Sequence, residues 1–164
     1  MAQQSDKDAE PKEDLSISEA AEYLLEECRM VLPGIQALFG FQLVAVFNQR
    51  FGELLSAAEQ KLHLLAIGLV AIAVALIMTP AAFHRQEGAR VVTERFLQIS
   101  TRLMLWSMLP LAVGICVDFY LIARIILDSG VVPLLTAALF AVFLVLWFVL
   151  PRVRGLQHLI ITLK

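Results

Sequence analysis

The sequence predicts an all-α integral membrane protein, a four-helix bundle preceded by a cytoplasmic amphipathic helix. Of its 164 residues, 59% are hydrophobic, above the roughly 45–50% of soluble domains, and a chain this short has too little interior to bury them. Four apolar runs are long enough to cross a bilayer: residues 33–51, 62–83, 103–126 and 131–150. A helical pattern with one charged face directly precedes the first run. The lipid bilayer is therefore the first partner we expect.

The N-terminal region divides into two parts. Residues 1–14 are charged and hold almost nothing apolar, so they are predicted to be a disordered acidic tail. Ser16 and Glu19 then form a capping-box pattern, and apolar residues recur at helical spacing through residue 32. Residues 15–32 are therefore predicted to be an amphipathic helix at the membrane interface. Its acidic face favours docking on the protein's own inner surface, with lipid binding as the alternative.

The first span, residues 33–51, carries more polar groups than the other three. Pro33 suits the first turn of a helix, where its missing N–H is not needed. Gln36 and Gln42 are costly in lipid unless another helix faces them. They are six residues apart, about 120° around a helix, so they cannot line one narrow stripe. We expect interhelical hydrogen bonds from them; the alternative is a polar lining for a small solute path.

The remaining spans are plainer. Residues 62–83 are alanine-rich, with Ala71 and Ala75 forming a small-xxx-small pair that admits a close neighbour, and Pro80 is expected to kink or end this span. A basic segment, residues 84–102, leads to the third span, and a tight turn at residues 128–130 leads to the fourth. Residues 151–164 are predicted to be a basic tail at the interface.

The distribution of Lys and Arg predicts the orientation. The other side of the membrane holds only Arg50, Lys61 and Arg124, whereas the side of the two termini holds ten such residues: Lys7, Lys12, Arg29, Arg85, Arg90, Arg95, Arg102, Arg152, Arg154 and Lys164. Since positive charge collects on the cytoplasmic side, both termini should be cytoplasmic. No basic region followed by a short apolar core opens the chain, so no cleaved signal peptide is visible.

Asp118 is the one carboxylate inside a predicted span, and an ionisable group there is a functional candidate by default. At ~1.5 Å per residue from residue 103 it lies about 22 Å into a core about 30 Å thick, in its outer third. Arg50 and Arg124 are placed near the same level and can pair with it. We expect a structural ion pair or a carboxylate that reaches the headgroups; a proton or cation site is the alternative.

Other polar residues give weaker signals. His84 and Arg85 end the second span, and His84 is either a pH-sensitive switch or an interfacial anchor, which is the commoner role. Cys28 and Cys116 fit no metal or redox spacing and are expected to be free thiols. The sequence has no metalloprotease, phosphate-loop or serine-nucleophile motif and no basic stripe for nucleic acid. We therefore expect no enzyme, no cofactor, no metal and no nucleic-acid partner.

The segments ECRMVLPGIQALFGFQLVAVFNQRF and TPAAFHR resemble an uncharacterised family of small four-span bacterial integral membrane proteins, a domain of unknown function sometimes labelled antiporter. The resemblance covers roughly residues 24–154, and its main markers are Glu27, Arg29, Gly34, Gln36, Phe39, Phe41, Phe47, Arg50, Phe51, Pro80, His84 and Arg85. It implies a protein of the bacterial inner membrane and lends no activity or substrate.

Two functions remain open from the sequence. The favoured one is a non-enzymatic membrane protein that acts through helix packing, as a homo-oligomer or as an accessory subunit of a larger complex. The alternative is a small oligomeric ion- or proton-coupled transporter or channel that uses Asp118, Gln36 and Gln42. Small multidrug exporters also have four spans, but their chemistry needs a glutamate in the first one, where this chain has glutamines.

Overall fold

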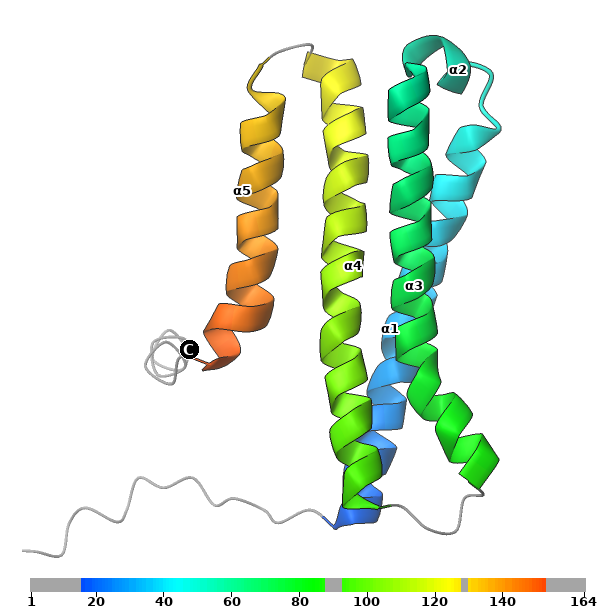
Figure 1. The fold of residues 1–164 in the computed structure, drawn as a ribbon, viewed down its shortest axis with the longest axis vertical. Coiled ribbons are helices and arrows are strands. Elements are labelled where there is room, and N and C mark those ends of the chain that lie inside the picture. Colours follow the sequence, from blue (N-terminus) through cyan, green and yellow to red (C-terminus); the bar gives the residue numbers. More distant parts are fainter. Residues whose placement is uncertain (1–15, 88–92, 128–129, 153–164) are drawn as a thin grey trace, which may run out of the picture.

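A computed structural model describes residues 16–87, 93–127 and 130–152, and these residues are helical almost throughout, with no strand among them. The long helices run up and down in chain order (Figure 1): α1 (Ile17–Val46), α3 (Ala57–Glu87), α4 (Glu94–Leu127) and α5 (Val132–Leu144), with the short α2 (Phe51–Leu54) between the first two. α5 continues as a π-helical turn, η1 (Val145–Val149), and a 3₁₀ turn, η2 (Leu150–Arg152). The predicted all-α fold with four long apolar helices is confirmed.

Four helical segments are long and apolar enough to cross a membrane: Ile17–Val46, Ala57–Gln86, Glu94–Leu127 and Val132–Arg152. This is the build of a multi-pass membrane protein. The described chain begins and finishes on the side of the bundle opposite α2 (Figure 1). The predicted tail of residues 1–14 and the C-terminal tail beyond Arg152 lie outside the described residues.

The predicted amphipathic helix does not exist as a separate element, because α1 is one continuous helix through the expected boundary at residues 32–33. The capping box is confirmed: the Glu19 N–H donates to Ser16 Oγ, and the Ser16 N–H donates to Glu19 Oε2 at 2.9 Å. Pro33 lies inside the helix. A proline there removes one backbone hydrogen bond, and membrane helices tolerate this where their surroundings compensate the freed carbonyl.

Other predicted boundaries also differ from the structure: α1 ends at Val46, before the predicted end of the first span at residue 51, and α3 begins at Ala57, before the predicted start at residue 62. α4 begins at Glu94, nine residues before the predicted third span, and α3 continues to Glu87, past the predicted end at residue 83. A transmembrane helix can continue beyond the hydrocarbon layer, and hydropathy does not detect its polar end turns. Pro80 does not end α3; Figure 1 shows the last turns of α3 bending away from the bundle, as a proline kink predicts.

α3 and α4 form the central pair of the bundle, with α1 packed mainly on α3 and α5 packed on α4. The buried face of α3 includes Ala66, Val70, Ala73 and Ile77. A Cβ placed on Gly114 of α4 would lie 3.1 Å from Val70 Cγ2 and 3.3 Å from the Ala66 carbonyl oxygen. The two helices therefore approach closely because residue 114 has no side chain. The alanines singled out by the sequence, Ala71 and Ala75, are instead exposed on α3.

One apolar cluster ties α1 to this pair. Leu24, Cys28 and Ile35 of α1 pack with Val70 and Ile77 of α3, and the Cys28 thiol lies 3.6 Å from the Met104 sulfur on α4. Cys28 and Cys116 are both buried free thiols, as predicted. The cluster lies toward the end of the bundle away from α2. The contacts at the α2 end of the bundle are of a different kind.

Candidate functional site

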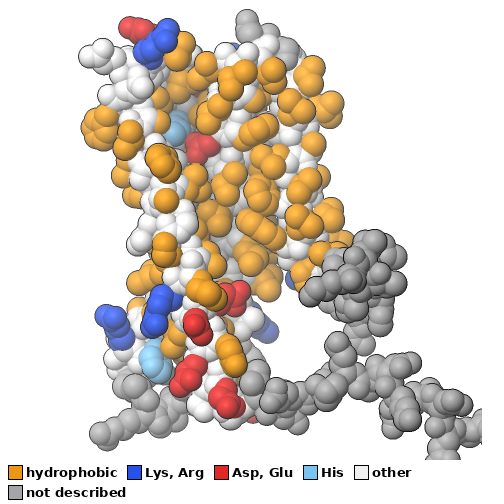
Figure 2. Space-filling view, turned by 180° about the vertical axis from the view of Figure 1, so that it is seen from behind, with side chains coloured by type: hydrophobic (Ala, Val, Ile, Leu, Met, Phe, Trp, Pro, Cys, Tyr) orange, Lys and Arg blue, Asp and Glu red, His pale blue; other side chains and the backbone are white. Residues whose placement is uncertain are grey.

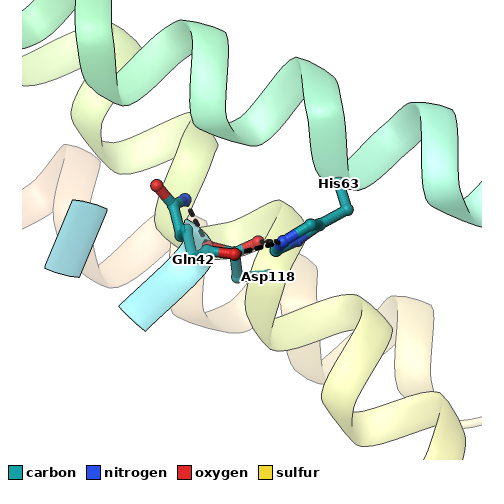
Figure 3. Close-up of polar contacts among 3 residues, drawn as sticks. All are labelled: Gln42, His63 and Asp118. Carbon is teal, nitrogen blue, oxygen red and sulfur yellow. Dashed lines mark hydrogen bonds and ion pairs between the residues drawn. The ribbon is translucent and has the colours of Figure 1, made fainter. Parts of the chain in front are cut away.

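Three polar side chains from three helices meet near the α2 end of the bundle (Figure 3): Gln42 of α1, His63 of α3 and Asp118 of α4. Each lies a few turns inside its helix, about 6 to 14 Å from the helix end at ~1.5 Å per residue. Gln42 is 4% exposed, and the side chains of His63 and Asp118 are 8% and 14% exposed. We call these residues the Gln42–His63–Asp118 cluster.

Both oxygens of Asp118 are engaged. Gln42 Nε2 donates to Asp118 Oδ2 at 2.5 Å, and His63 Nδ1 lies 3.0 Å from Asp118 Oδ1. The other ring nitrogen, His63 Nε2, lies 3.0 Å from the Gln42 backbone carbonyl oxygen. The imidazole therefore joins α1 to α4, and the cluster fixes all three helices relative to one another.

For both contacts of His63 to be hydrogen bonds, the cluster must hold two protons. A backbone carbonyl only accepts, so His63 Nε2 must carry a hydrogen. The contact between Nδ1 and Oδ1 needs a second one, which resides either on the histidine or on the aspartate. The pair is thus imidazolium with carboxylate, or neutral imidazole with carboxylic acid. Both forms have zero net charge, which suits a buried pair in an apolar surrounding.

One atom of the cluster is left without a partner. Gln42 Oε1 is buried and has no hydrogen-bond partner among the described residues, and Figure 3 shows it turned away from Asp118. A buried polar atom without a partner costs about 1–3 kcal/mol. Such an atom next to an ionisable pair marks a site that is not optimised for stability alone.

The cluster is closed toward the end of the bundle by α2 and its flanks. The ring of Phe51, the first residue of α2, lies 5.3 Å from the His63 ring, centroid to centroid, at an interplanar angle of 59°. Asn48 Oδ1 accepts from the Arg50 N–H at 3.0 Å and shapes the turn that leads into α2. The chain thereby returns over the cluster and separates His63 from the end of the bundle.

The predicted partners of Asp118 are wrong. Arg124 Nη1 pairs with Glu59 Oε1 at 2.8 Å, and among the described residues Arg50 makes only backbone hydrogen bonds, with Asn48, Glu53 and Leu54. Arg124 lies six residues beyond Asp118, so it is displaced along the helix and rotated around it. His63 is the partner of Asp118, where the sequence analysis expected an arginine.

The other predicted positions lie apart from the cluster. Gln36 is exposed on α1, on a different face from the buried Gln42, as their six-residue spacing predicted. His84 lies against Phe96 with ring centroids 6.2 Å apart, and Arg85 is exposed near the same helix end. The structure thus brings Gln42 and Asp118 together and leaves Gln36, Arg50, His84, Arg85 and Arg124 outside.

The sequence analysis did not identify His63 as the partner of Asp118. A usable signal was depth: Gln42 lies near the end of α1, His63 near the start of α3 and Asp118 near the end of α4, so all three fall toward the same end of the bundle. A membrane carboxylate requires a partner at its own level. Among the described residues no group of three or more His, Cys, Asp or Glu side chains is arranged to hold a metal ion.

The sequence pattern of one protein family, described as a family of unknown function (DUF6328), matches residues 17–151. Comparison with curated proteins gives no match, and comparison with solved structures gives none either.

Proposed function

Since the chain belongs to the family of unknown function DUF6328, we propose a function from the Gln42–His63–Asp118 cluster: a small proton-coupled transporter in which the His63–Asp118 pair takes up and releases one proton. Intramembrane ionisable residues that face a bundle interior are typical of proton pathways. The observation that carries the proposal is the placement of both His63 ring nitrogens on acceptors, Asp118 Oδ1 and the Gln42 carbonyl oxygen.

Loss of one proton changes this arrangement more than it would change an ordinary ion pair. The pair then holds a single hydrogen for two contacts, so one nitrogen lone pair faces an oxygen lone pair. The cluster also becomes net negative in an apolar surrounding, which is costly. His63 then loses either its contact with the Gln42 carbonyl of α1 or its contact with Asp118 of α4. Proton release is thereby linked to the packing of α1 or α4 against α3.

The other charged side chains at this end leave the pair alone. Glu59 of α3 and Arg124 of α4 neutralise each other. The remaining charges are exposed and are screened by water and salt: Arg50, Glu53 and Lys61. Among the described residues, no ion pair links any of these five to His63 or Asp118. The cluster is therefore expected to respond to pH as a unit of its own.

A location in the bacterial inner membrane with both termini cytoplasmic belongs to the same proposal. The excess of Lys and Arg on the side of the termini supports it, ten residues against three. The cluster then lies near the outer face, where a proton arrives from the higher external concentration. Four spans alone form a thin pathway, so the transporter is proposed to work as an oligomer, without enzymatic activity or cofactor.

Proton flux into vesicles tests this function. The full chain is reconstituted into liposomes that contain a pH-sensitive dye, and an inward proton gradient is imposed. We expect a flux above that of empty liposomes, and its loss in Asp118→Asn and in His63→Gln. Glu26→Gln, which removes an exposed carboxylate of α1 far from the cluster, should keep it. A flux equal in all four proteins, or no flux in the wild type, would overturn the proposal.

A second candidate is the packing function, supported by surface that the single chain leaves uncovered. Gln36 is exposed within an apolar helix, and Val132 is the one buried residue of α5. A glutamine amide in lipid is stabilised by a hydrogen bond from another helix. A homo-oligomer or a larger membrane complex would supply one. This role and proton binding use different faces of α1, so the two are separable by substitution.

A further inference from the structure

A cavity of about 260 Å³ lies directly beside the cluster, between α1, α2 and α4. Its walls are almost entirely apolar and include Leu38, Phe41, Phe51, Leu121, Ile122 and Ile125. Gln42, His63 and Asp118 form its polar part. The cavity is therefore an apolar chamber with one ionisable pair in its wall.

The cavity opens sideways, toward the region that lipid occupies. Phe41 on α1 and Ile122 and Ile125 on α4 line it and are 75%, 57% and 45% exposed on the outer surface of the bundle. Figure 2 shows this kind of surface, with one acidic and one histidine side chain surrounded by hydrophobic ones. A molecule that reaches the cavity by this route must dissolve in the bilayer, so it has an apolar body.

The charge of the His63–Asp118 pair indicates which charge that molecule carries. With its shared proton the His63–Asp118 pair is neutral, and without it the pair is net negative by one. Asp118 is the more exposed of the two side chains, at 14% against 8%. A single positive charge at Asp118 would restore neutrality after the proton leaves. The rings of Phe41 and Phe51 line the cavity, and an aromatic ring attracts a cation placed over its face.

We propose that this cavity binds a monovalent organic cation with an apolar body, and that the cation and the shared proton compete for Asp118. The inference rests on the proposed function and names its substrate class. No covalent step is involved: the cation enters from the bilayer, one proton leaves to water, and the net charge of the cluster stays at zero. An exchange of this kind moves one charge in each direction.

The test compares two ligands of nearly equal shape. Benzyltrimethylammonium has one aromatic ring and a permanent charge, and neopentylbenzene is its neutral carbon analogue. Isothermal titration of the full-length protein in detergent should show cation binding that weakens about tenfold per pH unit below the pH of proton release, with one proton released per cation. Neopentylbenzene should bind with no such pH dependence.

Variants assign the effect to the cavity. Asp118→Asn should weaken cation binding at least about tenfold and keep the binding of neopentylbenzene, which also reports that the variant is folded. Phe51→Leu should weaken cation binding about threefold. Glu26→Gln should change the binding of neither ligand. Equal binding of both ligands by the wild type, or cation binding unchanged in Asp118→Asn, would overturn the inference. If proton flux persists while the cation does not bind, the proposed function stands and the substrate class is wrong.

Discussion

His63 Nδ1 lies 3.0 Å from Asp118 Oδ1, although the two residues are 55 positions apart. The contact joins α3 to α4 in a region where water is scarce. Each side chain removes the cost of burying the other, because an ionisable group in an apolar surrounding is stable mainly as part of a pair. The stability of the bundle should therefore depend on the two together more than on either alone.

A double-mutant cycle measures this dependence. Asp118→Leu and His63→Leu should each lower the free energy of unfolding by about 3–5 kcal/mol, because each leaves a buried polar partner uncompensated. The double variant should be less destabilised than the sum of the two. Thermal unfolding in detergent, followed by circular dichroism, gives the comparison, and Glu26→Gln should stay within about 0.5 kcal/mol of the wild type. Strict additivity would mean that the two residues do not act as a pair.

The ion pair between Arg124 and Glu59 should matter much less. The Arg124 side chain is 50% exposed and the Glu59 side chain 12%, and ion pairs that reach solvent contribute about 0–1 kcal/mol. Arg124→Gln should therefore shift the unfolding temperature little and leave proton flux intact. Loss of flux in this variant, measured in the same liposome assay, would show that Arg124 controls Asp118 after all.

Substitution of the two glutamines of α1, one at a time, should distinguish packing within one chain from packing between chains. Gln42→Leu removes the donor to Asp118 Oδ2, so it should destabilise the monomer by about 1–3 kcal/mol. Gln36→Leu removes an exposed amide and should weaken oligomerisation, seen as a smaller particle in light scattering in detergent. An unchanged oligomer and melting point in Gln36→Leu would count against the packing function.

Close approach of α3 and α4 at Gly114 gives a prediction with an internal control. Gly114→Leu places atoms where Val70 and the Ala66 carbonyl already lie, so it should destabilise the bundle by about 1–3 kcal/mol. Gly40→Leu introduces the same side chain on α1, where nothing lies within 4 Å of the added Cβ. It should be neutral or slightly stabilising, because leucine is the better helix former. Equal melting temperatures for both variants would refute the close contact.

Labelling of engineered cysteines tests the sidedness. In a background with Cys28 and Cys116 replaced by alanine, a membrane-impermeant maleimide added outside intact cells should label Glu53→Cys, which lies in α2. Glu22→Cys, exposed on α1 near the opposite end, should react only after the cells are opened. The reverse pattern would invert the proposed orientation and place the cluster near the cytoplasm.

Hydropathy predicted the four helices because lipid imposes length and apolar composition on each one separately. It did not predict that residues 17–46 form one helix, because a proline reads as a start signal whether it begins a helix or lies within one. Hydropathy also did not identify the partner of Asp118. Gln42, His63 and Asp118 lie on three helices, and hydropathy says nothing about which faces of those helices meet. His63 has apolar neighbours on both sides in the sequence, so no local pattern marked it.

The unbroken course of α1 has a mechanical consequence. Thirty residues at ~1.5 Å each make a rod about 45 Å long, longer than the ~30 Å hydrocarbon layer. Its polar first turns therefore reach beyond that layer, and Gln42 lies near the other end of the same helix. The backbone of a single helix therefore connects one end of the bundle to the amide that donates to Asp118 near the other end.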